Sequence, residues 1–526
     1  MRGRVLSLLR RLRTSDDRTS VAVRAAAVVL GFTAVSVLLR GAFVANRNYL
    51  NPDEVESMAQ ALAARHSPVP YKTWATATTG PFWPLFLALL AILGLPMTAA
   101  FSHLLAAVFV GLIGAFGYVL ARRALGPLVG LAVVVVVWLP LVLALPGNTW
   151  DFGGMVTELL PAVLLLGAAS IPFASLDRRP WLHAIAGLLA GLAVGAKYQA
   201  LPIALIVLAV PLVLGRVRRP RELATRAGLW VAGAAAPALV ILVAMLLTPS
   251  VSWSIVGQFL TYLSQYGEKL SAGDRLRGTW YLLSADHVIV LLALVGWLAL
   301  RSTRRVALAR ALAVAGGAAA VAAGGNMFGH YLFFMYAGLL IAIGLPLRPE
   351  RPALPVVGEP RRTAAVATIA LFAWLISFGP TLGGPQLTGP REFAAALDSD
   401  TVVRDPRLTA ACPPGSQVLV WGWAPEMYVN YSWRNATPVF NTYLWSGTPA
   451  NREAGYGIVR AAIENPATDC VFEASGDPYF YPPDERNPEL AAFYPGLADI
   501  LTRQYRTVPN LVDCAACTVH IRVVLP

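Results

Sequence analysis

Three carboxylates stand close together near the N-terminus: Asp53, Glu54 and Glu56, within "NRNYLNPDEVESMAQALAARH" at residues 46–66. A carboxylate placed beside a hydroxyl can accept its proton and act as a general base, which typically accelerates a reaction about 10²–10⁴-fold. Asp53 is the candidate base. Glu54 is its candidate partner, which would orient the acceptor or the loop or simply cap a helix.

The same stretch also has a purely structural interpretation. Asn51 suits the N-cap of a helix, Pro52 suits its first turn, and Glu54 lies three residues after the cap, as in a capping box. Asp53, Glu54 and Glu56 would then only complement the positive end of the helix dipole. Both interpretations place the start of a helix at Asn51.

A second acidic segment, "PGNTWDFGGMVTE", carries Asp151 and Glu158 and is expected on the same side of the membrane. Carboxylates opposite cations at a lipid boundary suit an anionic, lipid-borne substrate. The candidates for binding the phosphate of such a substrate are Lys197, His330, Tyr331, Lys72 and Arg65.

Two of these candidates have structural alternatives. A lysine at the end of a Gly/Ala-rich span is costly unless it is paired, which makes Lys197 a candidate phosphate ligand, but it could also snorkel to the lipid headgroups. His330 opens a span in a "GHY" turn, where a histidine is often structural.

Metal binding is a further alternative for the acidic residues. Asp151 and Glu158 could hold a divalent cation together with Asp53, because carboxylate oxygens are hard ligands, or they could cap their loop. No other cofactor is expected, because the sequence has no Walker A loop, dinucleotide fingerprint or Cys/His metal cluster.

The composition indicates a membrane protein. Of 526 residues, 56% are hydrophobic and only 13% are charged, and the mean hydropathy is +0.59, which leaves too little polar surface for a soluble globule. The net charge of +13 comes from arginines clustered between apolar runs, a pattern of membrane topology and not of nucleic-acid binding.

Hydropathy predicts a polytopic α-helical protein with about eleven transmembrane helices. The apolar run at 21–44 is too long for a signal-peptide core, so we expect an uncleaved first span with the N-terminus in the cytoplasm. The predicted spans are 22–44, 99–120, 127–145, 155–175, 181–196, 200–215, 227–247, 286–300, 307–323, 330–346 and 363–379.

One apolar segment, residues 80–96, is expected not to span. It is short and interrupted by prolines, and counting it as a span would place Arg122 and Arg123 outside the cell. As an interfacial helix of a first outer loop at about 45–98, it leaves every later arginine cluster on the cytoplasmic side, as the positive-inside rule requires.

The chain is expected to divide into a transmembrane domain, 1–379, and an extracytoplasmic α/β domain, 380–526. The second part is rich in Pro, Asp, Asn and aromatic residues and has alternating segments such as "CTVHIRVVL". All four cysteines lie in it, which favours two disulfides in one of three pairings over a zinc site. They are Cys412, Cys470, Cys514 and Cys517.

Aromatic residues in this tail have two interpretations. They could stack on sugar rings through their apolar faces, or they could form the core of the domain. We expect Trp421 to belong to the core and leave both roles open for Trp423, Tyr428 and Trp445.

The order of the motifs resembles a known family. A first span is followed by "PDE" at Pro52 to Glu54, a helix ending in "SPVPY", and "TGPFWPLFLALLAILG"; later come "LLAGLAVGAKYQAL", "GHYLFF" and "VLVWGWAPEMYVNYSWRNATPVFNTY". Through most of the chain this arrangement is similar to the lipid-linked-sugar glycosyltransferases of the GT-C superfamily, particularly the protein O-mannosyltransferase and aminoarabinose transferase branch. That branch usually has a "KPP"-like element where this chain has "TTGPFWP", and Lys72 could substitute for its basic group.

The resemblance implies a GT-C-like enzyme of the plasma (inner) membrane. Its donor would be a polyprenyl-phosphate sugar, and its acceptor a hydroxyl of a cell-envelope glycan, lipid or protein. Transfer would invert the anomeric carbon in one displacement. A phosphate is already a good leaving group, so a single base suffices where a glycosidase needs two carboxyl groups.

Two other functions remain open at this stage. A transporter or flippase of lipid-linked intermediates would be expected to carry ionisable residues near mid-span and to show repeated halves. A binding scaffold for cell-envelope polymers would not depend on its loop acids.

Overall fold

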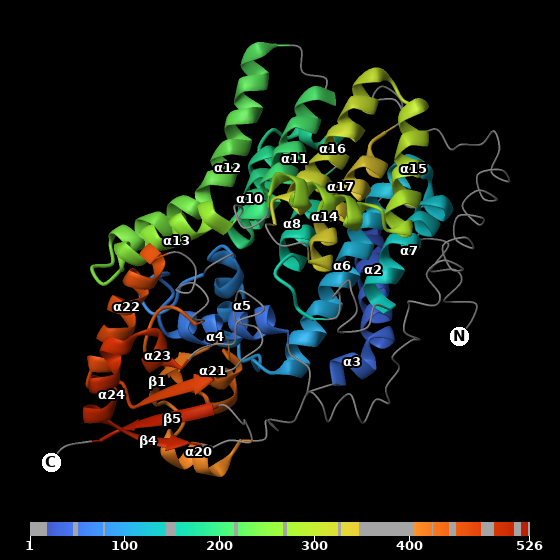
Figure 1. Ribbon diagram of the computed structural model, residues 1–526. Helices are drawn as coiled ribbons and strands as arrows, with labels where there is room; N and C mark the ends of the chain where they lie inside the picture. Colours follow the sequence, from blue (N-terminus) through green and yellow to red (C-terminus); the bar gives the residue numbers. More distant parts are fainter. Residues whose placement is uncertain are drawn as a thin grey trace.

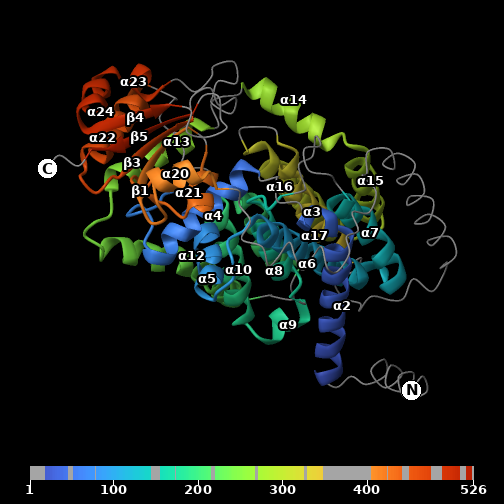
Figure 2. The ribbon, with the colours of Figure 1, turned by 90° about the horizontal axis from the view of Figure 1, so that it is seen from below.

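The protein consists of a helical bundle and a smaller α/β unit (Figures 1 and 2). Helices α4 and α5 lie between the two parts in Figure 1. The computed structural model describes residues 18–45, 51–76, 79–143, 154–171, 173–214, 219–266, 271–324, 328–346, 404–422, 424–440, 449–474, 489–509 and 517–523.

The bundle accounts for most of the predicted spans. Each of the first ten coincides with at least part of a described helix, and the eleventh, 363–379, lies outside the described residues, as does the expected domain boundary at 379/380. The helices of the bundle are α2 (Arg18–Leu39), α3 (Gly41–Ala45), α6 (Ala99–Leu125), α7 (Pro127–Leu143), α8 (Leu159–Ala169), α9 (Phe173–Arg178), α10 (Leu182–Ala196), α11 (Leu201–Leu214), α12 (Pro220–Leu246), α15 (Asp286–Leu300), α16 (Arg304–Ala322) and α17 (Leu332–Gly344), with 3-10 turns η1 (Tyr198–Ala200) and η3 (Gly329–Tyr331).

Three described helices, α6, α12 and α16, are each long and apolar enough to cross a bilayer alone. A fourth span results if α14 (Ala272–Leu283) and α15, which meet at a bend of 83°, are counted together. Helix α17 is apolar throughout and buried along its whole length, as expected for the centre of a bundle.

Helix α5 (Phe82–Ile92) lies within the segment that was predicted to form a short helix in the membrane interface. It has 11 residues, so its length is about 16 Å, against about 30 Å for the hydrocarbon core of a bilayer. It packs against α4 (Pro52–His66) and against α10 of the bundle.

Small residues allow α10 and α12 to pack closely. A Cβ added at Gly187 would collide with the carbonyl of Trp230, and one added at Gly191 would collide with the carbonyl of Ala234. The second contact lies four residues further along the chain than the first in both helices, so α10 and α12 run parallel. Such backbone contact through glycine is a common way to join helices in lipid.

At the end of the bundle away from α4, two arginines bind the ends of helices. Arg123 donates to the carbonyl of Ser170 after α8. Arg310 is fully buried and donates to the carbonyls of Ala342 and Leu345 at the end of α17. These bonds satisfy carbonyl groups that a helix terminus leaves without an intrahelical partner.

The C-terminal unit is built on a five-stranded mixed sheet of order β2-β1-β3-β5-β4. Strand β1 is parallel to β2 and β3, whereas β5 is antiparallel to β3 and β4. The strands are β1 (Gln417–Trp421), β2 (Arg434–Asn435), β3 (Cys470–Ala474), β4 (Tyr505–Pro509) and β5 (Cys517–Arg522); the helices are α20 (Pro406–Ala411), α21 (Glu426–Tyr431), α22 (Pro449–Glu464), α23 (Leu490–Phe493) and α24 (Ala498–Gln504), with η5 (Pro495–Leu497).

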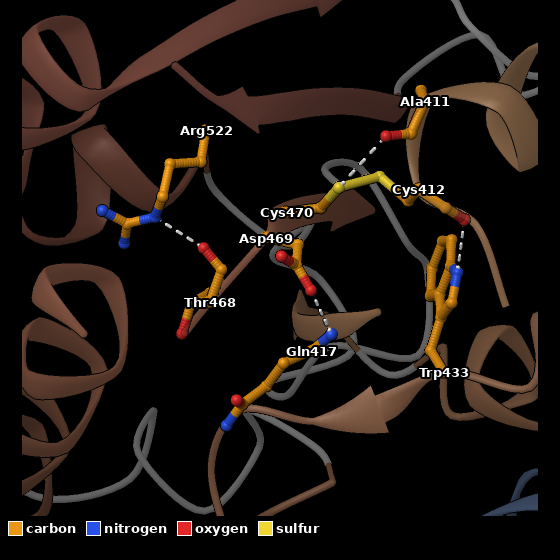
Figure 3. Close-up of a disulfide and its surroundings, with 8 residues drawn as sticks. All are labelled: Ala411, Cys412, Gln417, Trp433, Thr468, Asp469, Cys470 and Arg522. Atoms are coloured by element: carbon orange, nitrogen blue, oxygen red, sulfur yellow. Dashed lines mark hydrogen bonds between the residues drawn. A yellow bond between two sulfur atoms is a disulfide. The ribbon is translucent and has the colours of Figure 1, made fainter. Parts of the chain in front are cut away.

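A disulfide joins Cys412, after α20, to Cys470 at the start of β3 (Figure 3). Cys517 is also disulfide-bonded, and Cys514 lies outside the described residues. The indole of Trp433 donates to the carbonyl of Cys412 at 2.8 Å beside the bridge. The expectation of disulfides is confirmed for Cys412 and Cys470, which are therefore not zinc ligands.

The aromatic residues described in this unit form its core. Trp421 is fully buried against Phe493 and Tyr494, with ring centroids 5.3 and 5.7 Å away, as predicted. Tyr428 is also buried, and its hydroxyl donates to Asn435 Oδ1 at 2.7 Å, so it is not available for stacking on a sugar. Trp423 and Trp445 lie outside the described residues.

Candidate functional site

Helix α4 begins with the capping box expected from the sequence. The Asn51 side chain accepts a hydrogen bond from the Asp53 backbone N at 2.9 Å, and the Glu54 side chain accepts one from the Asn51 backbone N at 3.3 Å. Two helix-terminal N–H groups are thereby satisfied. The structural interpretation of Asn51 and Glu54 is correct.

Glu54 is fully buried and connects α4 to its neighbours. Its carboxylate accepts hydrogen bonds from the Ser102 hydroxyl in α6 and from the Met155 backbone N at 3.4 Å. His103 Nε2 lies 3.5 Å from Glu54 Oε2, and Arg40 interacts with the same carboxylate electrostatically.

Opposing effects act on the pKa of Glu54. Burial raises it, but His103 and the hydrogen bonds from Ser102 and Asn51 together outweigh burial and leave the pKa below its ordinary value. Glu54 is therefore a buried anion at neutral pH. Its contacts hold the start of α4 against the neighbouring elements.

Asp53 precedes this buried anion and is held at the first turn of α4. Its backbone N donates to Asn51, and its carbonyl accepts a hydrogen bond from the Ser57 hydroxyl at 2.7 Å. The side chain is half-buried, in contrast to Glu54. Glu56 is also half-buried and accepts a hydrogen bond from Gln60 at 2.9 Å.

A second buried polar cluster brings together four residues that the sequence analysis had selected. Lys197 Nζ lies 2.9 Å from Glu158 Oε1, and His330 Nε2 lies 3.9 Å from Glu158 Oε2. The Tyr331 ring lies below Lys197, with its centroid 6.0 Å from Nζ. Glu158 is fully buried and Lys197 is 3% exposed. Lys197 is therefore paired inside the protein and does not snorkel.

Thr157 completes this cluster, because Lys197 Nζ donates to its hydroxyl at 2.8 Å. Lys197 Nζ therefore has two oxygen atoms of described residues close to it, the hydroxyl of Thr157 and Oε1 of Glu158.

The segment 154–158 connects the two clusters. A Cβ at Gly154 would lie 3.3 Å from Glu54 Oε2, and Met155 donates to Glu54, while Glu158 pairs with Lys197. Both clusters therefore lie at the end of the bundle that carries α4.

The segment "TTGPFWP" also lies beside Lys197. The Gly80 backbone N donates to the Ala196 carbonyl at 3.0 Å, and a Cβ at Gly80 would collide with Gly195. Gly80 therefore packs against the residues that directly precede Lys197.

The remaining site residues from the sequence analysis are not part of these clusters. Arg65 and Lys72 are exposed, and Arg65 is twelve residues along α4 from Asp53, about 18 Å at the rise of an α-helix. The role of Arg65 as a phosphate ligand therefore stays a prediction. Asp151 lies outside the described residues. A cation held by Asp151 and Asp53 therefore stays a prediction. The described ranges contain no group of three potential metal ligands.

Sequence reasoning missed Ser102, His103, Arg40 and Thr157. Ser102 and His103 were counted within an apolar span, although polar residues at the start of a span are often paired with a neighbour. Arg40 carried a clearer signal, because a charge within an apolar run is expensive and usually has a partner.

Comparison with solved structures returned membrane glycosyltransferases of the GT-C class. The chain is similar to ArnT from Cupriavidus metallidurans bound to undecaprenyl phosphate, with 13% identity, a TM-score of 0.49, and coverage of 97% of this chain and 99% of the other. It is also similar to the oligosaccharyltransferase of Archaeoglobus fulgidus, with 13% identity, a TM-score of 0.40, and coverage of 85% and 68%.

At 13% identity and TM-scores of 0.49 and 0.40, these likenesses carry no argument about the fold, the substrates or the residue roles of this chain. No protein-family model and no curated protein matches the sequence. The function is therefore argued from the site itself.

Proposed function

We propose that the protein is an integral membrane glycosyltransferase that moves a sugar from a polyprenyl-phosphate donor to an acceptor hydroxyl. It would act at the outer face of the plasma membrane, with the N-terminus in the cytoplasm and the C-terminal unit outside. The observation that carries the proposal is one partly exposed carboxylate, Asp53, at the same end of the bundle as a buried cationic cluster.

Asp53 acts as the general base in this proposal. Its backbone is fixed by Asn51 and Ser57, and Glu54 anchors the same turn to α6. A base held in this way can accept the proton of an acceptor hydroxyl as the oxygen attacks the anomeric carbon. Glu54 is a positioning residue, because its oxygens are already occupied by protein donors.

Lys197 and His330 bind the donor phosphate in this proposal. The ammonium group of Lys197 is held by Glu158 and Thr157, and one of its three N–H donors would bind the phosphate. Positive groups that are fixed before the reaction stabilise the charge that develops on a departing phosphate. The chemistry requires no metal ion, and a cation at Asp53 and Asp151 remains a separate proposal.

The location of the charges favours an enzyme over a transporter. Glu158 and Lys197 lie at helix ends, next to α8 and α10, and not at mid-span. A transporter of lipid-linked intermediates would be expected to carry its ionisable groups near the middle of the bilayer.

Donor consumption by the purified protein tests the proposal. The full chain is reconstituted in vesicles with polyprenyl-phosphate mannose, galactose or arabinose, and a cell-envelope extract supplies acceptors. We expect free polyprenyl phosphate to form with at least one donor, and to form only with extract present. If the donors cross the bilayer and remain intact, the protein is a transporter and the proposal is wrong.

A further inference from the structure

Helix α14 presents large apolar side chains to its surroundings. Leu276 is 72% exposed and Trp280 is 71% exposed. They are four residues apart, so they lie on one face of the helix. An exposed apolar face of this kind marks contact with lipid or with another molecule.

The rest of α14 divides into two other faces. Thr279 and Leu282 are buried and face the protein, where α14 packs against α16. Arg277 and Asp274 form an exposed ion pair at 2.6 Å on the side away from the protein. At 100° per residue, the apolar face of Leu276 and Trp280 lies between the buried face and the charged one.

The orientation of α14 identifies the surface that it contacts. It meets α15 at 83°, and α15 is an apolar helix that was predicted to span the membrane. A helix perpendicular to a span lies along the plane of the membrane. Figure 2 shows α14 at the edge of the molecule, and none of the described helices covers its outer side there.

We propose that α14 rests on the phospholipid leaflet at the α4 end of the bundle. Leu276 and Trp280 enter the acyl region, while Arg277 and Asp274 face the headgroups and water. A tryptophan at this depth is typical of membrane interfaces, because its ring is apolar and its N–H is polar. The partner is therefore the lipid surface itself.

Helix α13 (Trp253–Tyr266) in the same loop has the same division of faces. Ile255 and Phe259 are buried, in one hydrophobic cluster with Tyr71 and with residues of the C-terminal unit such as Trp421. Trp253 and Leu260 are exposed on the other side. The proposal therefore includes both helices: α13 and α14 lie on lipid, and α13 also packs against the C-terminal unit.

Fluorescence in vesicles tests this proposal. A Trp280→Cys variant of the full chain is labelled with the polarity-sensitive fluorophore NBD and reconstituted in vesicles of phosphatidylethanolamine and phosphatidylglycerol. The described cysteines are disulfide-bonded, so labelling without reductant is directed to the new thiol, and the unsubstituted chain serves as the blank. Thr502→Cys, at an exposed site on α24, is the matched control.

We expect the label at residue 280 to emit at shorter wavelength than the label at residue 502. It should also lose more than half of its fluorescence to lipids that carry a nitroxide near the headgroup. Quenching by aqueous iodide equal to that at residue 502 would overturn the proposal. Shielding from both quenchers would also overturn it, because a protein partner or a second copy would then cover this face.

Discussion

Lys197 Nζ lies 2.9 Å from Glu158 Oε1 at the end of the bundle that carries α4, and neither side chain is appreciably exposed. A buried pair of this kind is sensitive to the loss of one partner, because the remaining charge is left without compensation. Substitutions at this pair can therefore measure two quantities separately: the stability of the bundle and the contribution of the lysine to donor binding.

Removing one charge of this pair should destabilise the protein more than removing both. We expect Lys197→Met and Glu158→Gln each to cost about 3–5 kcal/mol of unfolding free energy. The double variant should recover most of that loss but should still bind polyprenyl phosphate poorly. Denaturant unfolding in detergent and a lipid-binding assay measure the two effects. Normal binding by the stable double variant would remove Lys197 from the donor site.

Asp53→Asn should lower sugar transfer by about 10²–10⁴-fold, the usual contribution of a general base. The amide retains the shape of the side chain but cannot accept the proton, so donor binding and the melting temperature should change little. Glu56→Gln is the matched control, since Glu56 is half-buried on the same helix. Turnover by Asp53→Asn at the rate of the control would exclude Asp53 as the base.

Stability should fall in acid through Glu54. The pKa of Glu54 is depressed in the folded state, so its contribution is present above the unfolded value of about 4.3 and is lost as the pH falls through the folded pKa. Glu54→Gln should cost about 1.5–3 kcal/mol at neutral pH, the range for hydrogen bonds to a charged group.

The pH dependence provides the check on this assignment. Unfolding of Glu54→Gln should depend less on pH below about 4 than unfolding of the unsubstituted protein, while Glu56→Gln should retain the full dependence. Parallel curves for all three proteins would contradict the assignment of this acid sensitivity to Glu54.

Loss of the disulfide should loosen the C-terminal unit alone. Cys412 and Cys470 are separated by 58 residues, for which loop-closure entropy gives a stabilisation of about 4 kcal/mol. Cys412→Ala combined with Cys470→Ala should make the unit more sensitive to protease while the membrane part remains intact. Protein purified without reductant should also show no reactive thiol at these positions, and labelling of either would argue against the bridge.

The sequence predicted those parts of the fold that depend on local patterns. Ten of the eleven spans predicted from apolar runs coincide at least in part with described helices. Asn51, Pro52 and Glu54 predicted the start of α4. The segment at 80–96 was expected to contain a short helix, and α5 lies within it; that this helix does not span the membrane stays a prediction.

The sequence could not separate the roles of Asp53 and Glu54. Consecutive residues on a helix point about 100° apart, so the rotation of α4 against α6 decides which carboxylate is buried. That rotation depends on contacts with Ser102 and His103, which are distant in the sequence. For the same reason, Glu158, Lys197 and His330 could be assigned to one end of the bundle but not to one cluster.

The arginines that bind helix ends have a consequence for how the chain is inserted during synthesis. Ser170, the acceptor of Arg123, comes 47 residues later in the chain, and Ala342, an acceptor of Arg310, comes 32 residues later. When each arginine is added to the growing chain, its carbonyl partner has not yet been made, so under the proposed topology its full charge can act as a signal that retains that helix end on the cytoplasmic side. The same arginine can bind its carbonyl partner and hold the helix end in place only after the later helix has been synthesised and packed.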